Sequence, residues 1–247
     1  MVSEGFTRER GTARYRKRKP IPAIVIVVLL GLTAVIVWTK VIARASDVDA
    51  AVACTSASSA SSVAPTPTKA AKAPAKPTKA ATKPASGSAL PYNALDKVAP
   101  EPAADVKVQV LNASTQRGAA TQASSQLSQD GFQVAEPGND PLYPQQDMNC
   151  RGQIRFGANG ESAARTVSLL VPCTQLVKDS RQDATVDLAI GSDFTGVAPN
   201  TQAQQAIQQL AAWAAKHPTP KGGQQAQAGV LPKLNANLLA QAHSTQC

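Results

Sequence analysis

The amino-acid sequence predicts an α+β fold: a split β-α-β-β-α-β domain, in which a four-stranded antiparallel sheet carries two helices on one face. C-terminal helices follow this domain, and one N-terminal transmembrane helix precedes it. Three features support this prediction: an uncharged apolar run near the N-terminus, short stretches of alternating apolar and polar residues, and apolar residues at helical spacing between those stretches.

Residues 21–39 are an apolar run without a charged side chain. As a helix they would span ~28 Å, close to the ~30 Å hydrocarbon core of a bilayer. A cleaved signal peptide is the alternative, but its apolar core is shorter, and Arg44 interrupts the small residues that a cleavage site would need. We therefore expect an uncleaved signal anchor.

The flanking charges predict the orientation of this helix. Residues 1–20, the predicted cytoplasmic tail, contain seven Lys or Arg and two Glu. After the run, Lys40 and Arg44 are balanced by Asp47 and Asp49. The positive-inside rule places the N-terminus in the cytoplasm and the C-terminal domain outside a single-pass cell-membrane protein.

A membrane-proximal segment and stalk are expected at residues 40–91, where residues 55–90 are almost entirely Ala, Pro, Thr, Ser and Lys. Such a composition buries too little apolar surface to fold and favours extended geometry, which would reach ~90 Å. Its lysines either contact anionic wall polymers or only keep the linker soluble. The net charge of +9 comes from the tail and this segment, since residues 91–247 have eleven basic and twelve acidic side chains. We therefore expect no nucleic-acid partner.

The predicted extracytoplasmic domain occupies residues 92–199, and each of its elements has a local pattern. In the first strand, Val106, Val108 and Val110 alternate with polar residues. The elements follow in chain order: strand 106–110, helix 118–130, strand 132–135, strand 153–157, helix 161–171 and strand 184–190.

Two further segments follow the domain. An amphipathic helix is expected at residues 200–217 with Thr201 as its N-cap, and residues 218–247 form a flexible or weakly helical tail. The loop between the second and third strands is long, and loops of that length are often functional.

All four cysteines lie on the predicted outer side, where disulfides persist. Cys150 precedes the third strand, and Cys173 follows the helix that returns from it, so both should lie at one edge of the domain. We predict a Cys150–Cys173 disulfide. Cys54 and Cys247 then either pair with each other or link two chains in a homodimer. No closely spaced cysteine pair indicates a metal site, and we expect no metal and no cofactor.

No catalytic constellation is evident in the sequence. The two histidines, His217 and His243, both lie in the C-terminal region, away from any acid partner and nucleophile in the patterned domain. We therefore predict no catalytic residues and no enzymatic activity.

Two groups of residues are candidate ligand contacts. Arg151, Arg155 and Arg165 either clamp an anionic polymer or form salt bridges with Glu161, Asp147 or Asp187. Tyr143 and Trp213 could cover an apolar cleft against the sheet.

The ordered motifs of the domain resemble the LytR C-terminal domain family over roughly residues 105–196. The segments that carry the resemblance are VKVQVLNAST, DGFQV, GQIRFG, AARTVSLLVPC and ATVDLAIGSDF. PYNALDKVAPEPA, NDPLYP and CRGQIRFG extend the resemblance to actinobacterial envelope integrity proteins, in which a membrane anchor precedes one such module. Ala113 replaces the Gly that usually follows Leu-Asn in this family. The wall-polymer transferase domain found in other family members has no room in this chain.

The resemblance implies a non-enzymatic, wall-facing protein that supports cell-envelope integrity by binding cell-wall polymer or wall-assembly proteins. A carrier of lipid or another apolar ligand is the alternative function. An enzyme acting on a polyprenyl-linked glycan ranks last, because no acid–base pair or nucleophile is evident.

Overall fold

The computed structural model describes residues 21–54, 87–217, 231–244 and 247. The chain divides into two compact units, Met1–Arg44 and Ala45–Cys247. The predicted cytoplasmic tail, residues 55–86 of the predicted stalk and residues 218–230 lie outside the described residues.

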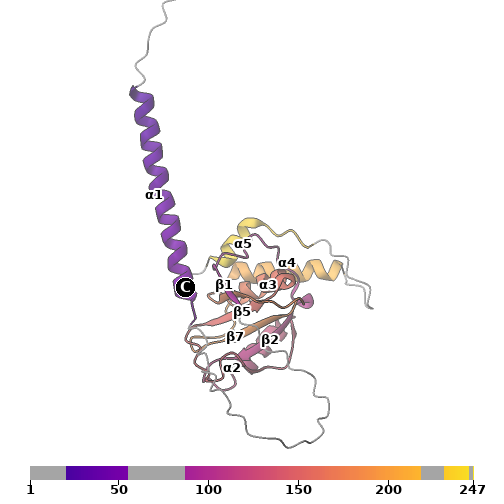
Figure 1. Cartoon of the computed structure of the whole chain (residues 1–247). Helices are drawn as coiled ribbons and strands as arrows, with labels where there is room; N and C mark the ends of the chain where they lie inside the picture. The colour runs from indigo at the N-terminus through magenta and orange to yellow at the C-terminus, as the bar shows by residue number, and fades with distance from the viewer. Residues whose placement is uncertain (1–20, 55–86, 218–230, 245–246) are drawn as a thin grey trace, which may run out of the picture. The chain divides into compact units, whose positions relative to one another are not determined.

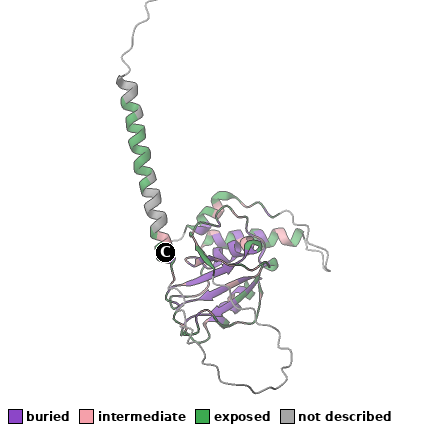
Figure 2. Cartoon of the chain, in the orientation of Figure 1, coloured by how far each residue is buried: buried purple, intermediate pink, exposed green. Residues whose placement is uncertain are grey.

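Helix α1 (Ile21–Val52) contains the apolar run. Its described large apolar side chains, from Val25 to Val37, are all more than half exposed (Figure 2). Several side chains of this helix, among them those of residues 21–24 and 40–46, lie outside the described part. Judged on the described residues alone, none of the helices combines the length and the apolar character that crossing a membrane requires.

The domain is built on one mixed sheet (Figure 1). Its strand order is β1-β6-β5-β7-β2-β3, and β4 pairs with β2 beyond the stretch that pairs with β3. The strands within the described residues are β1 (Ser88–Leu90), β2 (Lys107–Asn112), β3 (Gln133–Val134), β4 (Gly138–Asn139), β5 (Gly152–Phe156), β6 (Gln175–Lys178) and β7 (Val186–Ile190).

Two parallel βαβ units flank β7. Helix α2 (Ala119–Gln129) connects β2 to the parallel strand β3, and α3 (Glu161–Leu170) connects β5 to the parallel strand β6. Strand β7 lies between the units, parallel to β2 and antiparallel to β5. The predicted four-stranded antiparallel sheet is therefore wrong, because each crossover helix returns the chain to a neighbouring parallel strand.

The helices α2 and α3 cover one face of this sheet, as predicted. In the register, Ile154 lies between Leu188 and Leu176, and Phe156 lies beside Val186. These side chains are buried with the apolar stripes of α2 and α3 in a single core cluster. The strands that form its floor are buried along most of their length (Figure 2).

The ends of α2 follow from local sequence. Before the helix, the side-chain oxygen of Asn112 accepts hydrogen bonds from the backbone N–H and the hydroxyl of Ser114, which turns the chain. After it, Gly131 adopts φ 90°, and the N–H of Phe132 donates to Leu127 O at 3.1 Å. This is a glycine C-terminal motif, with Phe132 buried as its hydrophobic partner.

The remaining helices pack beyond α3. Helix α4 (Thr201–Lys216) contacts α3 and α5 (Ala236–His243), and the short helices η1 (Ala103–Asp105) and η2 (Ala158–Gly160) lie in connections. The N-cap of α4 is Asn200 rather than the predicted Thr201, because its side-chain oxygen accepts from Ala203 N at 2.8 Å. Helix α5 lies within residues 218–247, for which the sequence analysis expects a flexible or weakly helical tail.

Candidate functional site

The second face of the sheet carries polar side chains at its centre. Gln109, Asp187 and Arg155 are register neighbours on β2, β7 and β5, and Gln153 lies beside Gln175 on β6. Strand alternation points these five residues away from the core under α2 and α3. We call the surface formed by these five residues the polar face.

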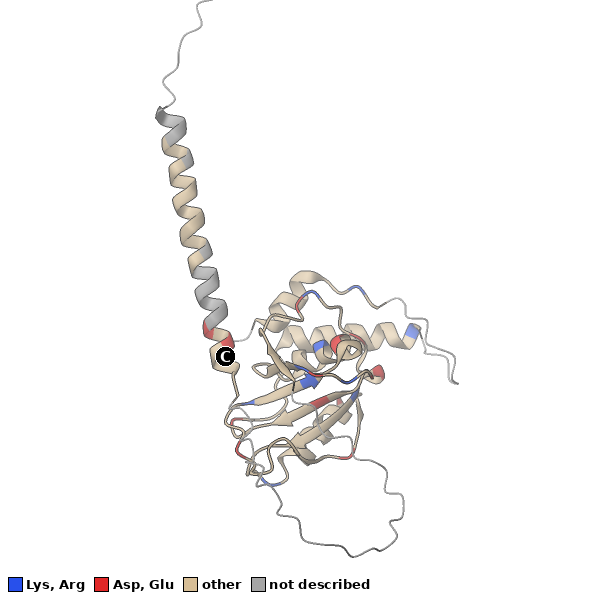
Figure 3. Ribbon diagram, in the orientation of Figure 1, with Lys and Arg blue, Asp and Glu red and all other residues tan. Residues whose placement is uncertain are grey.

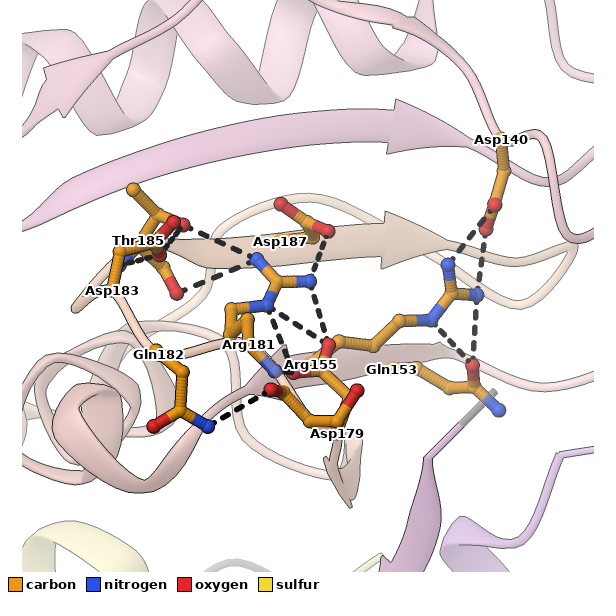
Figure 4. Close-up of polar contacts among 10 residues, drawn as sticks. Asp140, Gln153, Arg155, Asp179, Arg181, Gln182, Asp183, Thr185 and Asp187 are labelled. Atoms are coloured by element: carbon orange, nitrogen blue, oxygen red, sulfur yellow. Dashed lines mark hydrogen bonds and ion pairs between the residues drawn. The ribbon is translucent and has the colours of Figure 1, made fainter. Parts of the chain in front are cut away.

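A buried ion pair occupies the middle of the polar face (Figure 4). Arg155 donates two parallel hydrogen bonds to Asp140, from Nη1 to Oδ1 at 3.0 Å and from Nη2 to Oδ2 at 2.7 Å. The side chains of Arg155 and Asp140 are 3% and 0% exposed. Gln153 accepts two further bonds from the same guanidinium. The pair is fully hydrogen-bonded, which buried charges require.

The ion pair fixes the long loop after β4 onto the sheet. Asp140 N donates to Asn112 O at 2.8 Å, and Asp140 Oδ1 accepts from Leu142 N at 2.9 Å. The loop then buries Tyr143 and Met148 in a small apolar cluster on this side of the sheet. The pKa of Tyr143 is raised because its phenol is buried. The loop is therefore an ordered part of the domain, held by a charge pair at its start.

A second charged group lies at the β6–β7 connection, near the other end of Arg155 (Figure 4). Arg181 lies between two carboxylates, 2.7 Å from Asp179 Oδ2 and 2.6 Å from Asp187 Oδ2. Burial lowers the pKa of Arg181, but the hydrogen bonds and charges of both carboxylates outweigh it and raise the pKa. Hydrogen bonds from Thr185 hold the pKa of Asp183 below its usual value.

These groups differ in their access to solvent, which decides what the polar face can do. Asp140 and Arg155 are closed off, whereas Arg181 and Asp187 are 20% and 19% exposed and Gln109 is exposed. The accessible part offers amide, guanidinium and carboxylate groups, which can donate to and accept from hydroxyl and amide groups. Charges of both signs are interspersed over the domain (Figure 3). Among the described residues, no His, Cys, Asp and Glu side chains are grouped as a metal site would need.

The predicted disulfide pairing is wrong. The structure joins Cys54 to Cys150 and Cys173 to Cys247. Cys150 and Cys173 do lie near the same edge, since Gln153 and Gln175 just after them are paired. However, Cys150 packs with Tyr143 in the cluster on the polar side, and Cys54 packs against the same cluster. The prediction placed Cys150 and Cys173 at the correct edge of the sheet, but it did not consider on which face of the sheet each side chain lies. With both bonds formed within one chain, the described cysteines leave none for a covalent homodimer.

The three candidate arginines do not form one cluster. Arg155 lies on the polar face, paired with Asp140 rather than with a predicted acidic partner. Arg151 donates to Thr195 Oγ1 at 2.8 Å and to Gly196 O at 3.0 Å.

Arg165, on α3, is 1% exposed and lies 3.2 Å from Asp96 Oδ1. His243 Nδ1 of α5 lies 2.7 Å from the same oxygen, and Tyr92 stacks on the His243 ring. Burial lowers the pKa of Arg165. Burial raises the pKa of Asp96, but His243 and Arg165 outweigh it and lower the pKa overall. This cluster ties α5 to α3.

Tyr143 and Trp213, which the sequence analysis expects to cover one apolar cleft, do not lie together. Tyr143 is buried on the polar side of the sheet, whereas α4, which carries Trp213, packs on α3 on the opposite side. Trp213 instead stacks on His217 within its own helix end, with ring centroids 4.3 Å apart.

Sequence reasoning missed Asp140 and Asp96 as charge partners. One signal for Asp140 was available in the sequence. The alternation of β5 places Arg155 on the face opposite the core, and the apolar residues of β5 indicate a central strand. A charged side chain buried on a central strand needs an acidic partner. Asp96 had no comparable signal, because it lies outside any periodic element.

Comparisons with known proteins agree with this architecture. The family model described as LytR cell envelope-related transcriptional attenuator matches residues 105–194. The Cell envelope integrity protein Cei of Mycobacterium tuberculosis is 34% identical over 236 residues, which cover 96% of this chain and 97% of that protein. A crystal structure of the soluble domain of a conserved hypothetical secreted protein from Mycobacterium marinum is 33% identical and covers 65% of this chain and 98% of that one, with a TM-score of 0.53. The chain therefore belongs to the family of the cell envelope integrity protein Cei, and its residues 105–194 form a LytR C-terminal module.

Proposed function

We propose that the protein is a membrane-anchored, wall-facing and non-enzymatic component that supports cell-envelope integrity by binding a cell-wall polymer or a wall-assembly protein. The observation that carries this proposal is the similarity to a protein named for envelope integrity along almost the whole length of both chains. Relatedness over the anchor, linker and domain together favours a shared role more strongly than a match to the domain alone.

The anchoring part of the proposal rests on residues 21–39. They contain no charged side chain and lie in a helix whose described apolar residues are exposed. Exposed apolar surface of this extent is unfavourable in water and favourable in lipid. The seven basic residues before the run support a cytoplasmic N-terminus.

The wall-facing part is supported by the disulfides. The domain has two, and disulfides persist outside the cytoplasm rather than within it. Cys54 and Cys247, the two cysteines that are farthest apart in the chain, each take part in one of these two disulfides. A chain that keeps all four thiols oxidised is suited to an oxidising compartment.

The binding surface that we assign is the accessible part of the polar face with Arg181. Gln109, Gln175, Asp187 and Arg181 present hydrogen-bonding groups on one face of the sheet, without a strong net charge. Such groups suit hydroxyl-rich glycan or the amides of a peptide. The non-enzymatic part is supported by the pairing of Asp140, since this carboxylate is fully buried and both of its oxygens are bonded to the Arg155 guanidinium rather than exposed to a substrate.

The test is site-specific photocrosslinking in living cells that carry the full chain. A photoreactive amino acid replaces the exposed Gln109 on β2 in one strain and the exposed Gln204 on α4, on the other side of the domain, in a matched control. We expect the Gln109 position to crosslink to wall polymer or to an envelope protein, and the Gln204 position to crosslink far less. Equal yields at the two positions, or none at Gln109, would refute the assigned surface.

A further inference from the structure

The accessible part of the polar face presents oxygen atoms that can still accept hydrogen bonds. Gln109 Nε2 donates to a backbone carbonyl at 3.2 Å, so the amide oxygen is the atom of this side chain that stays open. Asp187 and Asp183 are each hydrogen-bonded through one carboxylate oxygen, Oδ2 and Oδ1. Among the described residues, no donor is bonded to Gln109 Oε1, Asp187 Oδ1 or Asp183 Oδ2. We call these three atoms the free acceptor oxygens.

The free acceptor oxygens gather on one side of the sheet. Gln109 on β2 and Asp187 on β7 are register partners on parallel strands, which lie ~4.8 Å apart. Asp183 lies in the turn before β7, where Thr185 N donates to it at 2.9 Å. Asp183 and Asp187 both lie around the Arg181 guanidinium (Figure 4). One extended ligand on this side of the sheet therefore meets acceptors from both strands.

The Arg181 guanidinium is already satisfied by the protein. Its Nε lies 3.0 and 2.9 Å from the two oxygens of Asp179, and its Nη2 donates to Asp187 Oδ2 at 2.6 Å. Its Nη1 faces Thr185 O and Oγ1 at 3.5 and 3.4 Å. The guanidinium of Arg155 is buried with its own counter-charge. Tight binding of a phosphate or carboxylate needs a guanidinium with open N–H groups, and neither arginine offers them.

The charges around the free acceptor oxygens also disfavour an anion. Three carboxylates and two cations meet here: Asp179, Asp183, Asp187, Arg181 and Lys107, which strand alternation places on the same face as Gln109. Hydrogen bonds from Thr185, with smaller contributions from the charges of Arg181 and Lys107, lower the pKa of Asp183, so this exposed carboxylate stays ionised. An anionic polymer would meet like charges at this surface, whereas an uncharged ligand would not.

We infer that this surface binds an uncharged, hydroxyl-rich glycan and rejects polymers that carry phosphate or carboxylate groups. The inference rests on the proposed binding function of the polar face and names the class of its ligand. Sugar hydroxyls donate to carboxylate and amide oxygens, which are the atoms that the surface leaves open. A peptide strand fits less well, because β5, β7 and β2 are each paired on both sides and leave no backbone edge here.

The first test compares ligands of different charge. Purified cell wall is separated by anion exchange into a neutral glycan fraction and an anionic fraction, and inorganic polyphosphate serves as a purely anionic probe. The full chain in detergent micelles should be retained on the immobilised neutral fraction and pass through the other two. Raising the salt concentration from about 0.05 M to about 0.5 M should change this retention by less than about twofold, because no ion pair is formed. Retention on an anionic probe, retention on none, or loss of binding in salt would overturn the inference.

Two variants test the named atoms. Gln109→Ala removes one free acceptor oxygen without a change in charge and should weaken retention on the neutral fraction by roughly twofold to tenfold. Gln204→Ala, at an exposed glutamine on α4, is the matched control and should leave retention unchanged. D183N/D187N keeps the side-chain shapes and removes two negative charges, so it should gain retention on polyphosphate. A D183N/D187N chain with an unchanged circular dichroism spectrum that still rejects polyphosphate would contradict the role of the carboxylates.

The crosslinking experiment at Gln109 separates this inference from the proposed function. A crosslink to neutral glycan would support both. A crosslink to an anionic polymer or to an envelope protein would refute the neutral-glycan class and leave the proposed function standing. No crosslink at Gln109 would refute the assigned surface, and the inference with it.

Discussion

Asp140 and Arg155 lie fifteen residues apart in the chain and form a bidentate ion pair that is almost completely buried on the polar face of the sheet. This pair joins the long loop after β4 to the central strand β5. Cys150, at the end of the same loop, carries the disulfide to Cys54. The charge pair and the disulfide therefore lie at the start and at the end of the same loop.

Removing one partner of this pair should destabilise the domain strongly. Asp140→Ala leaves the Arg155 guanidinium buried without a counter-charge, which costs roughly 3–5 kcal/mol. The free energy of unfolding from urea titration measures the loss. The double variant D140L/R155M, which removes both charges, should recover most of it. A D140A variant within 1 kcal/mol of the native chain would contradict the structural role of the pair.

The N-cap of α4 offers a second prediction with an internal control. Asn200→Ala removes the cap bond to Ala203 N and the side-chain bonds to Gln241 O and Ala242 O, both at 3.1 Å. We expect a loss of about 1–2 kcal/mol in the free energy of unfolding. Thr201→Ala, at the exposed next residue, should cost much less. Equal losses for the two variants would mean that Asn200 is not the cap.

Glu101 predicts a specific pH dependence of stability. Burial, with a smaller contribution from Asp105, raises the pKa of Glu101 to about 7. Its unfolded value is 4.5, so between these values the folded chain binds more protons than the unfolded chain. The contribution of Glu101 to stability is present below pH 4.5 and is lost as pH rises through about 7.

Urea titrations at several pH values in this window test the effect. The fall in stability with rising pH should be smaller in Glu101→Gln, which stays neutral and keeps the side-chain shape. The difference between the two chains isolates this carboxyl from the other titrating groups. Parallel curves for the two chains would contradict the assignment.

The C-terminal disulfide should act locally. C173S/C247S removes the covalent tie of the chain end while the His243–Asp96 pair remains. Hydrogen exchange is expected to accelerate in α5 and to change little in β5 and β7. Uniform acceleration across the sheet would show that this bond supports the whole domain.

The sequence pattern predicted the elements with strong periodicity and missed those without it. The alternation in β2, β5 and β7 and the stripes of α2 and α3 define one buried face, which the structure confirms. Strands β1 and β6 have three and four residues, too short for a periodic signal, and they exist because pairing partners are present. The parallel arrangement was also missed, because local pattern does not specify strand order.

In the candidate site, too, residues on periodic strands could be predicted and residues in irregular segments could not. Alternation along β5 puts Arg155 on the face opposite Ile154 and Phe156, and the register of the sheet agrees with it. Its partner Asp140 lies in an irregular loop, where the spacing of residues along the sequence does not predict their positions in space. For the cysteines, connectivity of elements predicted a shared edge for Cys150 and Cys173, but the pairing depends on which side of the sheet each side chain occupies.

The most direct test of the account is the thiol state of the full chain in intact cells. Cells are treated with acid to trap thiols, and the purified protein is alkylated before and after reduction and weighed by mass spectrometry. An extracytoplasmic domain clamped by Cys54–Cys150 and Cys173–Cys247 should take up no alkyl groups before reduction and four after it. Four alkyl groups before reduction would contradict both the compartment and the clamp.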